Sequence, residues 1–198
     1  MSNYTKTTNF AAKDSLPSGN PAKIVKGTEI NTEFDNIAVA IATKPETGVA
    51  NTFTDLQTFS GSSSVAAIAF PNAKEVVTVS ATAATGTINY DVTTQSVLYY
   101  TSNASANWTL NVRGSSGTSL NTLLSTGQSV TIAFLVTNGA TAYYQTGFQV
   151  DGSSVTPKWQ GGLAPASGSA SSIDVYVITI IKTASAAFTA LASQTKFA

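Results

Sequence analysis

The chain has 198 residues, of which only 10% are charged, and ten basic and ten acidic side chains give a formal net charge of zero. Nucleic-acid binding needs clustered lysine and arginine, but Arg113 is the single arginine, so we exclude a nucleic-acid partner. Because cysteine and histidine are absent, disulfides, thiolate metal sites and Ser-His or Cys-His catalytic pairs are excluded, and we expect no metal or cofactor.

Neither a signal peptide nor a membrane span is expected. The amino terminus lacks a basic stretch followed by an apolar one, and the longest apolar run, Val175–Ile181, is too short to cross a bilayer. A neutral surface rich in serine, threonine and asparagine has few charges to keep copies apart. This composition favours a permanent oligomer over a solvated monomer.

Residues 2–27 show no helical or strand period, and proline and glycine interrupt them. Their apolar side chains are too frequent for a solvated linker. We therefore predict an extended arm that orders against the surface of a partner. The residues expected to dock there are Tyr4, Phe10, Leu16, Ile24 and Val25.

One short amphipathic helix should follow, with Thr28 as its N-cap and an end at Lys44 and Pro45. A heptad-like seam runs along one face of this helix, formed by Ile30, Phe34, Ile37 and Ile41. Isoleucine at core positions favours trimers over dimers, so we predict a homotrimer held partly by this seam. The same face would also suit another protein or the chain's own second domain.

Residues 46–64 are interpreted as a connector between an arm-and-helix segment, residues 1–45, and a distal β-domain, residues 65–198. The charge distribution supports this boundary, since 11 of the 20 charged residues lie in the first 60. After it, the sequence alternates short apolar runs with turn residues.

Ten strands are predicted, and this number at this spacing is typical of an antiparallel β-sandwich or jelly roll. Alternation is clearest at Val130, Ile132, Phe134 and Val136, and again at Ile173, Val175 and Val177. The predicted strands span residues 65–70, 75–80, 87–92, 97–101, 108–113, 130–138, 142–150, 155–159, 173–183 and 187–191.

Turn residues separate these strands. Asn138-Gly139 is the strongest hairpin signal, and Asp151-Gly152 is interpreted as a second turn. Residues 161–172, rich in Gly, Ala, Pro and Ser, should form a long exposed loop.

No pattern of catalytic residues stands out. Asp151 and Asp174 lie near strand ends and are the best carboxylate pair for a glycosidase-type site, but Asp151 is better explained by its turn. A calcium loop at Asp151 would need further oxygens at alternating positions, which the sequence lacks. We therefore expect a structural or binding protein and not an enzyme.

Aromatic side chains lie in or beside the predicted strands, where they could stack on sugars or fill the core or a subunit interface. An adjacent Tyr-Tyr pair in a strand places one ring on each face. A host-surface glycan is a potential ligand, and the loop 101–107 is the favoured position because loops carry binding groups on rigid strands. The residues expected to bind it are Asn103, Ser105 and Asn107.

Three segments resemble known virion proteins. Residues 4–8, 24–30 and 33–38 are similar to the amino-terminal docking segment of many tailed-bacteriophage structural proteins, often tail fibres. Residues 51–61 resemble short repeats of phage fibre shafts. Residues 150–162, 180–183 and 194–197 are similar to a β-domain of marine and cyanobacterial phage structural proteins.

The resemblance implies a short tail fibre or tail appendage of a phage virion, assembled in the host cytoplasm. Its amino-terminal arm would dock on another virion protein, such as a tail adaptor, nozzle or neck protein, and its β-domain would face the host surface or another fibre protein. A head fibre or capsid decoration protein is the first alternative. A carbohydrate-binding module or depolymerase is the second.

Overall fold

A computed structural model describes residues 3–46, 48, 50–53, 57 and 72–198, and the chain divides into two compact units, residues 1–69 and 70–198. Each unit is described by itself. The predicted strand at residues 65–70 and most of the expected connector lie outside the described residues.

The amino-terminal unit is a hairpin of an arm and a helix. The arm holds α1 (Phe10–Asp14) and the 3-10 turn η1 (Pro21–Lys23), and the principal helix α2 spans Gly27–Ala42. Asn9 Oδ1 caps α1 by accepting from Ala12 N, and the Glu29 carboxylate reaches back to Lys26 N at the start of α2. The predicted helix is therefore present, with Lys26 rather than Thr28 as its N-cap. The expectation of an arm without regular structure is wrong.

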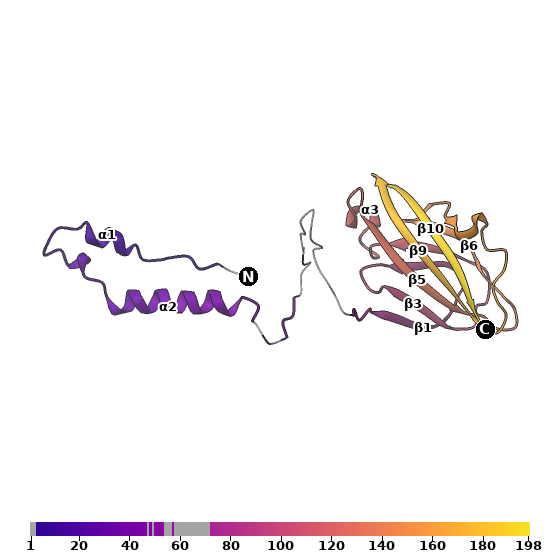
Figure 1. The fold of residues 1–198 in the computed structure, drawn as a ribbon, viewed down its shortest axis with the longest axis horizontal. Coiled ribbons are helices and arrows are strands. Elements are labelled where there is room, and N and C mark those ends of the chain that lie inside the picture. Colours follow the sequence, from indigo (N-terminus) through magenta and orange to yellow (C-terminus); the bar gives the residue numbers. More distant parts are fainter. Residues whose placement is uncertain (1–2, 47, 49, 54–56, 58–71) are drawn as a thin grey trace. The chain divides into compact units, whose positions relative to one another are not determined.

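The second unit is a β-domain of two sheets. Its strands are β1 (Val77–Ala83), β2 (Gly86–Asp91), β3 (Val97–Ser102), β4 (Trp108–Arg113), β5 (Ser129–Thr137), β6 (Gln145–Val150), β7 (Ser153–Ser154), β8 (Lys158–Trp159), β9 (Ile173–Ala184) and β10 (Ala187–Phe197). Two short helical turns join them, α3 (Leu120–Leu123) and η2 (Gln160–Gly162). One sheet has the order β1-β3-β5-β9-β10-β8, and the other has the order β2-β4-β6-β7. Figure 1 labels β1, β3, β5, β9 and β10 of the larger sheet.

The first six strands alternate between the two sheets. As a result β1, β3 and β5 pair in parallel in one sheet, and β2, β4 and β6 pair in parallel in the other. Among the strands that the structure describes, only the later pairs β5–β9, β9–β10 and β6–β7 are antiparallel. The mostly β, two-sheet prediction is confirmed, but the antiparallel arrangement is wrong, because each strand crosses to the opposite sheet before the chain returns beside it.

The two turn signals had different outcomes. Asp151 and Gly152 form the two-residue turn between β6 and β7, and both have positive φ angles, as a type I′ hairpin requires. Asn138-Gly139 is not a hairpin, since it links β5 and β6 in different sheets. The Asn138 side chain is buried there, where it binds both Tyr143 N and Tyr143 O.

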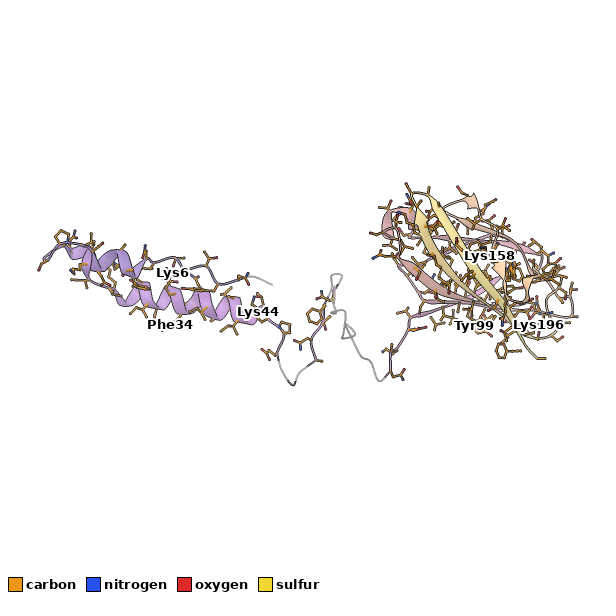
Figure 2. The ribbon with its side chains drawn as sticks, turned by 45° about the horizontal axis from the view of Figure 1, so that its top comes forward. Lys6, Phe34, Lys44, Tyr99, Lys158 and Lys196 are labelled. Atoms are coloured by element: carbon orange, nitrogen blue, oxygen red, sulfur yellow. The ribbon has the colours of Figure 1, made fainter. Side chains whose placement is uncertain are left out.

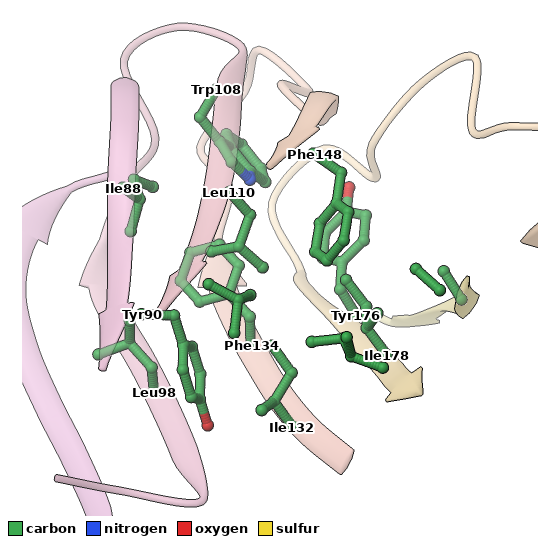
Figure 3. Packing of buried hydrophobic residues seen from close by; sticks show 14 of the residues in the cluster. Ile88, Tyr90, Leu98, Trp108, Leu110, Ile132, Phe134, Phe148, Tyr176 and Ile178 are labelled. Atoms are coloured by element: carbon green, nitrogen blue, oxygen red, sulfur yellow. The ribbon is translucent and has the colours of Figure 1, made fainter. Parts of the chain in front are cut away.

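The core lies between the sheets. Trp108 from the small sheet packs edge-on against Phe134 and Tyr176 of the large sheet, with ring centroids 6.0 and 5.9 Å apart. Figure 3 shows these rings among the aliphatic side chains of both sheets, including Leu110 and Ile178. Burial of this cluster fixes which face of each strand points inward.

Candidate binding surfaces

The arm of the first unit is fastened to α2 by one carboxylate. Glu33 accepts hydrogen bonds from Tyr4 Oη, Thr7 N at 2.9 Å, Thr7 Oγ1 at 2.6 Å and Thr8 N at 2.5 Å. Its side chain is buried, although it is a carboxylate. The arm therefore runs back along α2 and supplies the donors that this carboxylate needs.

Electrostatics favour the same arrangement. Hydrogen bonds from Thr7 and Tyr4 lower the pKa of the Glu33 carboxyl to about 2, so it is ionised at neutral pH. The ammonium group of Lys13 lies 2.9 Å from the Glu29 carboxylate and also donates to Ala22 O and Ile24 O. Lys13 therefore links α1 both to the segment around η1 and to the start of α2.

The five residues predicted to dock on a partner have two fates. Tyr4 contributes to the Glu33 contact, and Phe10 and Leu16 are half-buried within the hairpin. Ile24 and Val25 remain 67% and 44% exposed. The prediction that the whole arm orders only against another protein is therefore wrong, because much of it orders against α2.

The predicted seam on α2 is largely uncovered. Ile30, Phe34 and Ile41 are 40%, 63% and 64% exposed, whereas Ile37 is half-buried beside the stripe that the arm covers. Figure 2 shows Phe34 on the side of α2 that the arm leaves open. Within the described part of this unit, the helix has one side satisfied by its own arm and a neighbouring apolar side open to a partner.

In the β-domain, the predicted ligand loop does not form one site. Asn103 lines a shallow hollow of about 420 Å³ together with Asn138 and Ser171. Ser105 is exposed, and its backbone N–H binds Ala84 O. Asn107 Oδ1 accepts from Tyr144 N, so this side chain has a structural role.

A different cleft, of about 250 Å³, lies between β6 and the segment before β9. Tyr144 and Trp159 contribute aromatic walls, and Pro165 closes one side. Gln145 also lines it, and although this residue is buried, its Oε1 has no hydrogen-bond partner among the described residues. In the sequence, Trp159 is one of several aromatic residues in or beside the predicted strands. The sequence pattern does not show whether such a side chain lines a cleft or packs in the core.

The predicted loop 161–172 is mostly exposed but anchored at its end. Asp174 lies in the core side of β9, and its Oδ2 accepts from Ser169 N, Asn138 Nδ2 and Gln194 Nε2 at 3.0–3.2 Å. Burial raises the pKa of Asp174, an effect that the Ser169 N–H partly opposes. Gly168 is required here, because a Cβ would lie 2.1 Å from Tyr143 O.

Asp151 serves a separate structural purpose. Its carboxylate accepts from Leu120 N and Asn121 N at the start of α3, while Lys182 Nζ donates to Asn121 O and Leu124 O near the end of this short helix. Asp174 lies eight residues before Lys182 on the same strand, about 26 Å away for an extended chain. The two aspartates therefore do not face one cleft.

The described residues contain no group of three or more His, Cys, Asp or Glu side chains placed to hold a metal ion. Among the helices described, none is long and apolar enough to cross a membrane. Comparisons with protein-family models, with curated proteins and with solved structures found no match.

Proposed function

We propose that this protein is a structural component of a tailed-phage virion, a short tail fibre or tail appendage that docks through its amino-terminal hairpin and associates as a homotrimer. The observation that supports this most directly is the division into two units with different surfaces. The first carries exposed apolar side chains on a small polar hairpin, and the second is a nearly uncharged β-domain.

Docking would use the apolar residues that the hairpin leaves open. Ile24 and Val25 follow η1 and are exposed, so they can enter hydrophobic pockets on another virion protein. Because Glu33 already holds the arm on α2, less of the backbone has to be ordered on binding. The exposed α2 seam of Ile30, Phe34 and Ile41 would meet the same seam in other copies.

Substitution of both Ile24 and Val25 by aspartate tests the docking step. We expect the variant to keep its oligomeric state but to be absent from purified phage particles, as measured by immunoblotting. Thr5→Asp, an exposed position on the same arm, is the matched control and should be incorporated normally. Normal incorporation of the Ile24/Val25 variant would contradict the docking assignment.

The position in the particle separates the two structural alternatives. A tail appendage should place antibody or gold label on the tail in electron micrographs, whereas a head fibre or capsid decoration protein should place it on the capsid. The proposed function predicts tail labelling.

The cleft at Trp159 favours a second candidate function, binding of a carbohydrate. Tyr144 and Trp159 offer surfaces on which a sugar ring can stack. Tyr144→Ala should weaken binding to host polysaccharide on a glycan array or in calorimetry. Phe53→Ala, which removes an exposed aromatic ring of the first unit, is the control, and equal binding by both variants would exclude this site. A depolymerase would require a carboxylate pair other than Asp151 and Asp174.

A further inference from the structure

The large sheet of the β-domain is apolar on both of its faces. Its inner face carries Leu98, Phe134 and Tyr176, which are buried in the core. Because side chains alternate along a strand, their neighbours point to the outside. Figure 1 shows this sheet in the foreground, with β1, β3, β5, β9 and β10 in that order.

Two rows of side chains cross the outer face of these five strands. The registers of the strand pairs place them side by side. One row consists of Val77, Val97, Ala133, Val177 and Ser193. The next row consists of Val79, Tyr99, Leu135, Val175 and Thr195. Neither row contains a charged residue, and Val77, Val79 and Val177 are 49%, 64% and 38% exposed.

Three threonine hydroxyl groups on this face have partners within the sheet. Thr131 Oγ1 and Thr179 Oγ1 lie 2.9 Å apart in a hydrogen bond, and Thr101 Oγ1 donates to Ser80 O at 3.1 Å. Removing water from these groups is therefore inexpensive, because each keeps a hydrogen bond. Lys158 of β8 pairs with Leu191 at the margin and marks the end of the uncharged area.

The small sheet has the opposite outer face. Asn89 and Asn111 form a hydrogen-bonded pair in register with Gln149, and Arg113 forms an ion pair with Asp91. This outer face is polar, as expected for a sheet with one face in water. Such a face is typical of antiparallel sheets, although the principal strands of this sheet are parallel. The domain therefore has one outer face suited to solvent and one suited to cover.

We infer that the outer face of the six-stranded sheet is the surface through which the β-domains of separate copies associate. Five strands and about six residues along each give a footprint of roughly 24 by 20 Å, and two such faces would remove roughly 1,000 Å² from water, which is the lower limit for a specific interface. A second copy suits this face because neither copy has a charge that would be buried without a partner. In a trimer, three such faces would surround the axis.

This inference rests on the self-association part of the proposed function and not on the virion assignment. It can be tested on the full chain by mass measurement in solution, for example by light scattering at micromolar concentration. Val177→Lys places an ammonium group in the centre of the face and should convert the oligomer to monomers. An unpaired buried charge at each contact should raise the dissociation constant by about 100-fold or more.

Thr87→Lys is the matched control, because it adds the same charge to the outer face of the small sheet, where Thr87 is exposed. Its mass should equal that of the parent chain. Unchanged circular dichroism and tryptophan fluorescence in both variants show that the fold is intact. If Val177→Lys fails to fold, Val177→Cys supplies a single thiol in a cysteine-free chain, and alkylation of this thiol should be slow compared with Thr87→Cys.

The outcomes separate the two proposals. A parent chain that is monomeric overturns both the homotrimer and this surface. An oligomeric parent chain whose mass is unchanged by Val177→Lys, but which Phe34→Asp at the exposed seam dissociates, overturns this surface alone and assigns the contact to the α2 seam. Equal alkylation rates at positions 177 and 87 would also overturn it.

Discussion

The two sheets of the β-domain differ on their outer faces although they share one core. On the small sheet, Asn111 Nδ2 donates to Asn89 and Asn111 Oδ1 accepts from Gly152 N, so the polar groups satisfy one another. On the large sheet, valine, tyrosine and leucine occupy the equivalent positions, of which Val79 is 64% exposed. A polar face is complete in a single chain, whereas an apolar face is stabilised only by cover.

The helix α2 shows the same difference on a smaller scale. The side that carries Glu33 is covered by the chain's own arm, which supplies four hydrogen bonds to the carboxylate. The neighbouring side, with Phe34 and Ile41, is left exposed. In both cases the polar side, carrying Asn111 or Glu33, is satisfied within the chain, and the apolar side is left exposed. This division of surfaces is what the following predictions are designed to break or sharpen.

The largest loss of unfolding free energy should come from a substitution in the core between the two sheets. Phe134→Ala removes a fully buried ring that contacts Trp108 and Tyr176, and it should lower the free energy of unfolding by about 3–5 kcal/mol. Its neighbour Leu135 points to the outer face, so Leu135→Ala should cost far less in chain stability and instead weaken association. Chemical denaturation and light scattering on both variants measure the two effects. Equal losses of unfolding free energy would contradict the assignment of faces.

Much of this layout could be predicted from the sequence, but not the partners of each strand. The limits of β4 and the turn at Asp151 were predicted correctly because local alternation and turn chemistry decide them. The parallel pairing could not be predicted, since nothing local at Asn138-Gly139 distinguishes a hairpin from a crossover between sheets.

The alternation of the outer face was visible in the sequence, but which face is buried was not. Ile173, Val175 and Val177 alternate along the strand, yet the buried hydrophobic residues beside them are Tyr176 and Ile178. The continuous apolar run is the informative signal, because strands covered on both faces have such runs. For the candidate sites, the exposure of the α2 seam follows from its spacing. The contacts of Asn107 with Tyr144 and of Glu33 with Thr7 could not be predicted, because they join segments that are far apart in the sequence.

A smaller loss should follow from Asp174→Ala. The substitution leaves Asn138 Nδ2, Ser169 N and Gln194 Nε2 without their shared acceptor, which should cost about 2–3 kcal/mol of unfolding free energy. It tests whether internal polar contacts, and not apolar packing alone, hold the loop 161–172. Increased proteolysis within this loop is the second measurement, and a loss below about 1 kcal/mol would show that the network contributes little.

The same aspartate gives a pH dependence. Because burial raises its pKa in the folded state above the unfolded value, the folded chain binds the proton more tightly. The contribution of Asp174 to stability therefore declines as pH rises from the unfolded pKa through the raised folded pKa. Asp174→Asn, which cannot ionise, should flatten this part of the stability profile. A profile identical to that of the parent chain would show that Asp174 does not titrate differently on folding.

Asn111→Ala should have a more modest effect on the polar face. It removes the hydrogen bonds to Asn89 and Gly152 N, at a cost of about 1–2 kcal/mol in unfolding free energy, because both partners can reach water at the surface. The oligomeric state should not change, since this face is not expected to contact another copy. A change in mass would show that the small sheet, too, contributes to association.

The smallest and most local effect should be seen at Glu33. Hydrogen bonds from Thr7 and Tyr4 lower the pKa of its carboxyl to about 2, below the ordinary value of 4.5. The contact therefore contributes fully above pH 4.5 and is lost as pH falls toward 2, when the carboxylate takes up a proton and loses acceptor strength. Amide resonances of Thr7 and Thr8 should follow this titration in NMR spectra, and hydrogen exchange along the arm should accelerate at acidic pH relative to the intrinsic rate.

Glu33→Gln keeps an acceptor but cannot ionise, so the arm should be held less tightly on α2 at neutral pH and the titration should disappear. If the amide resonances of Thr7 and Thr8 show no pH dependence in the parent chain, the Glu33 carboxylate does not hold the arm. The contact with Glu33 would then not determine which side of α2 is left open.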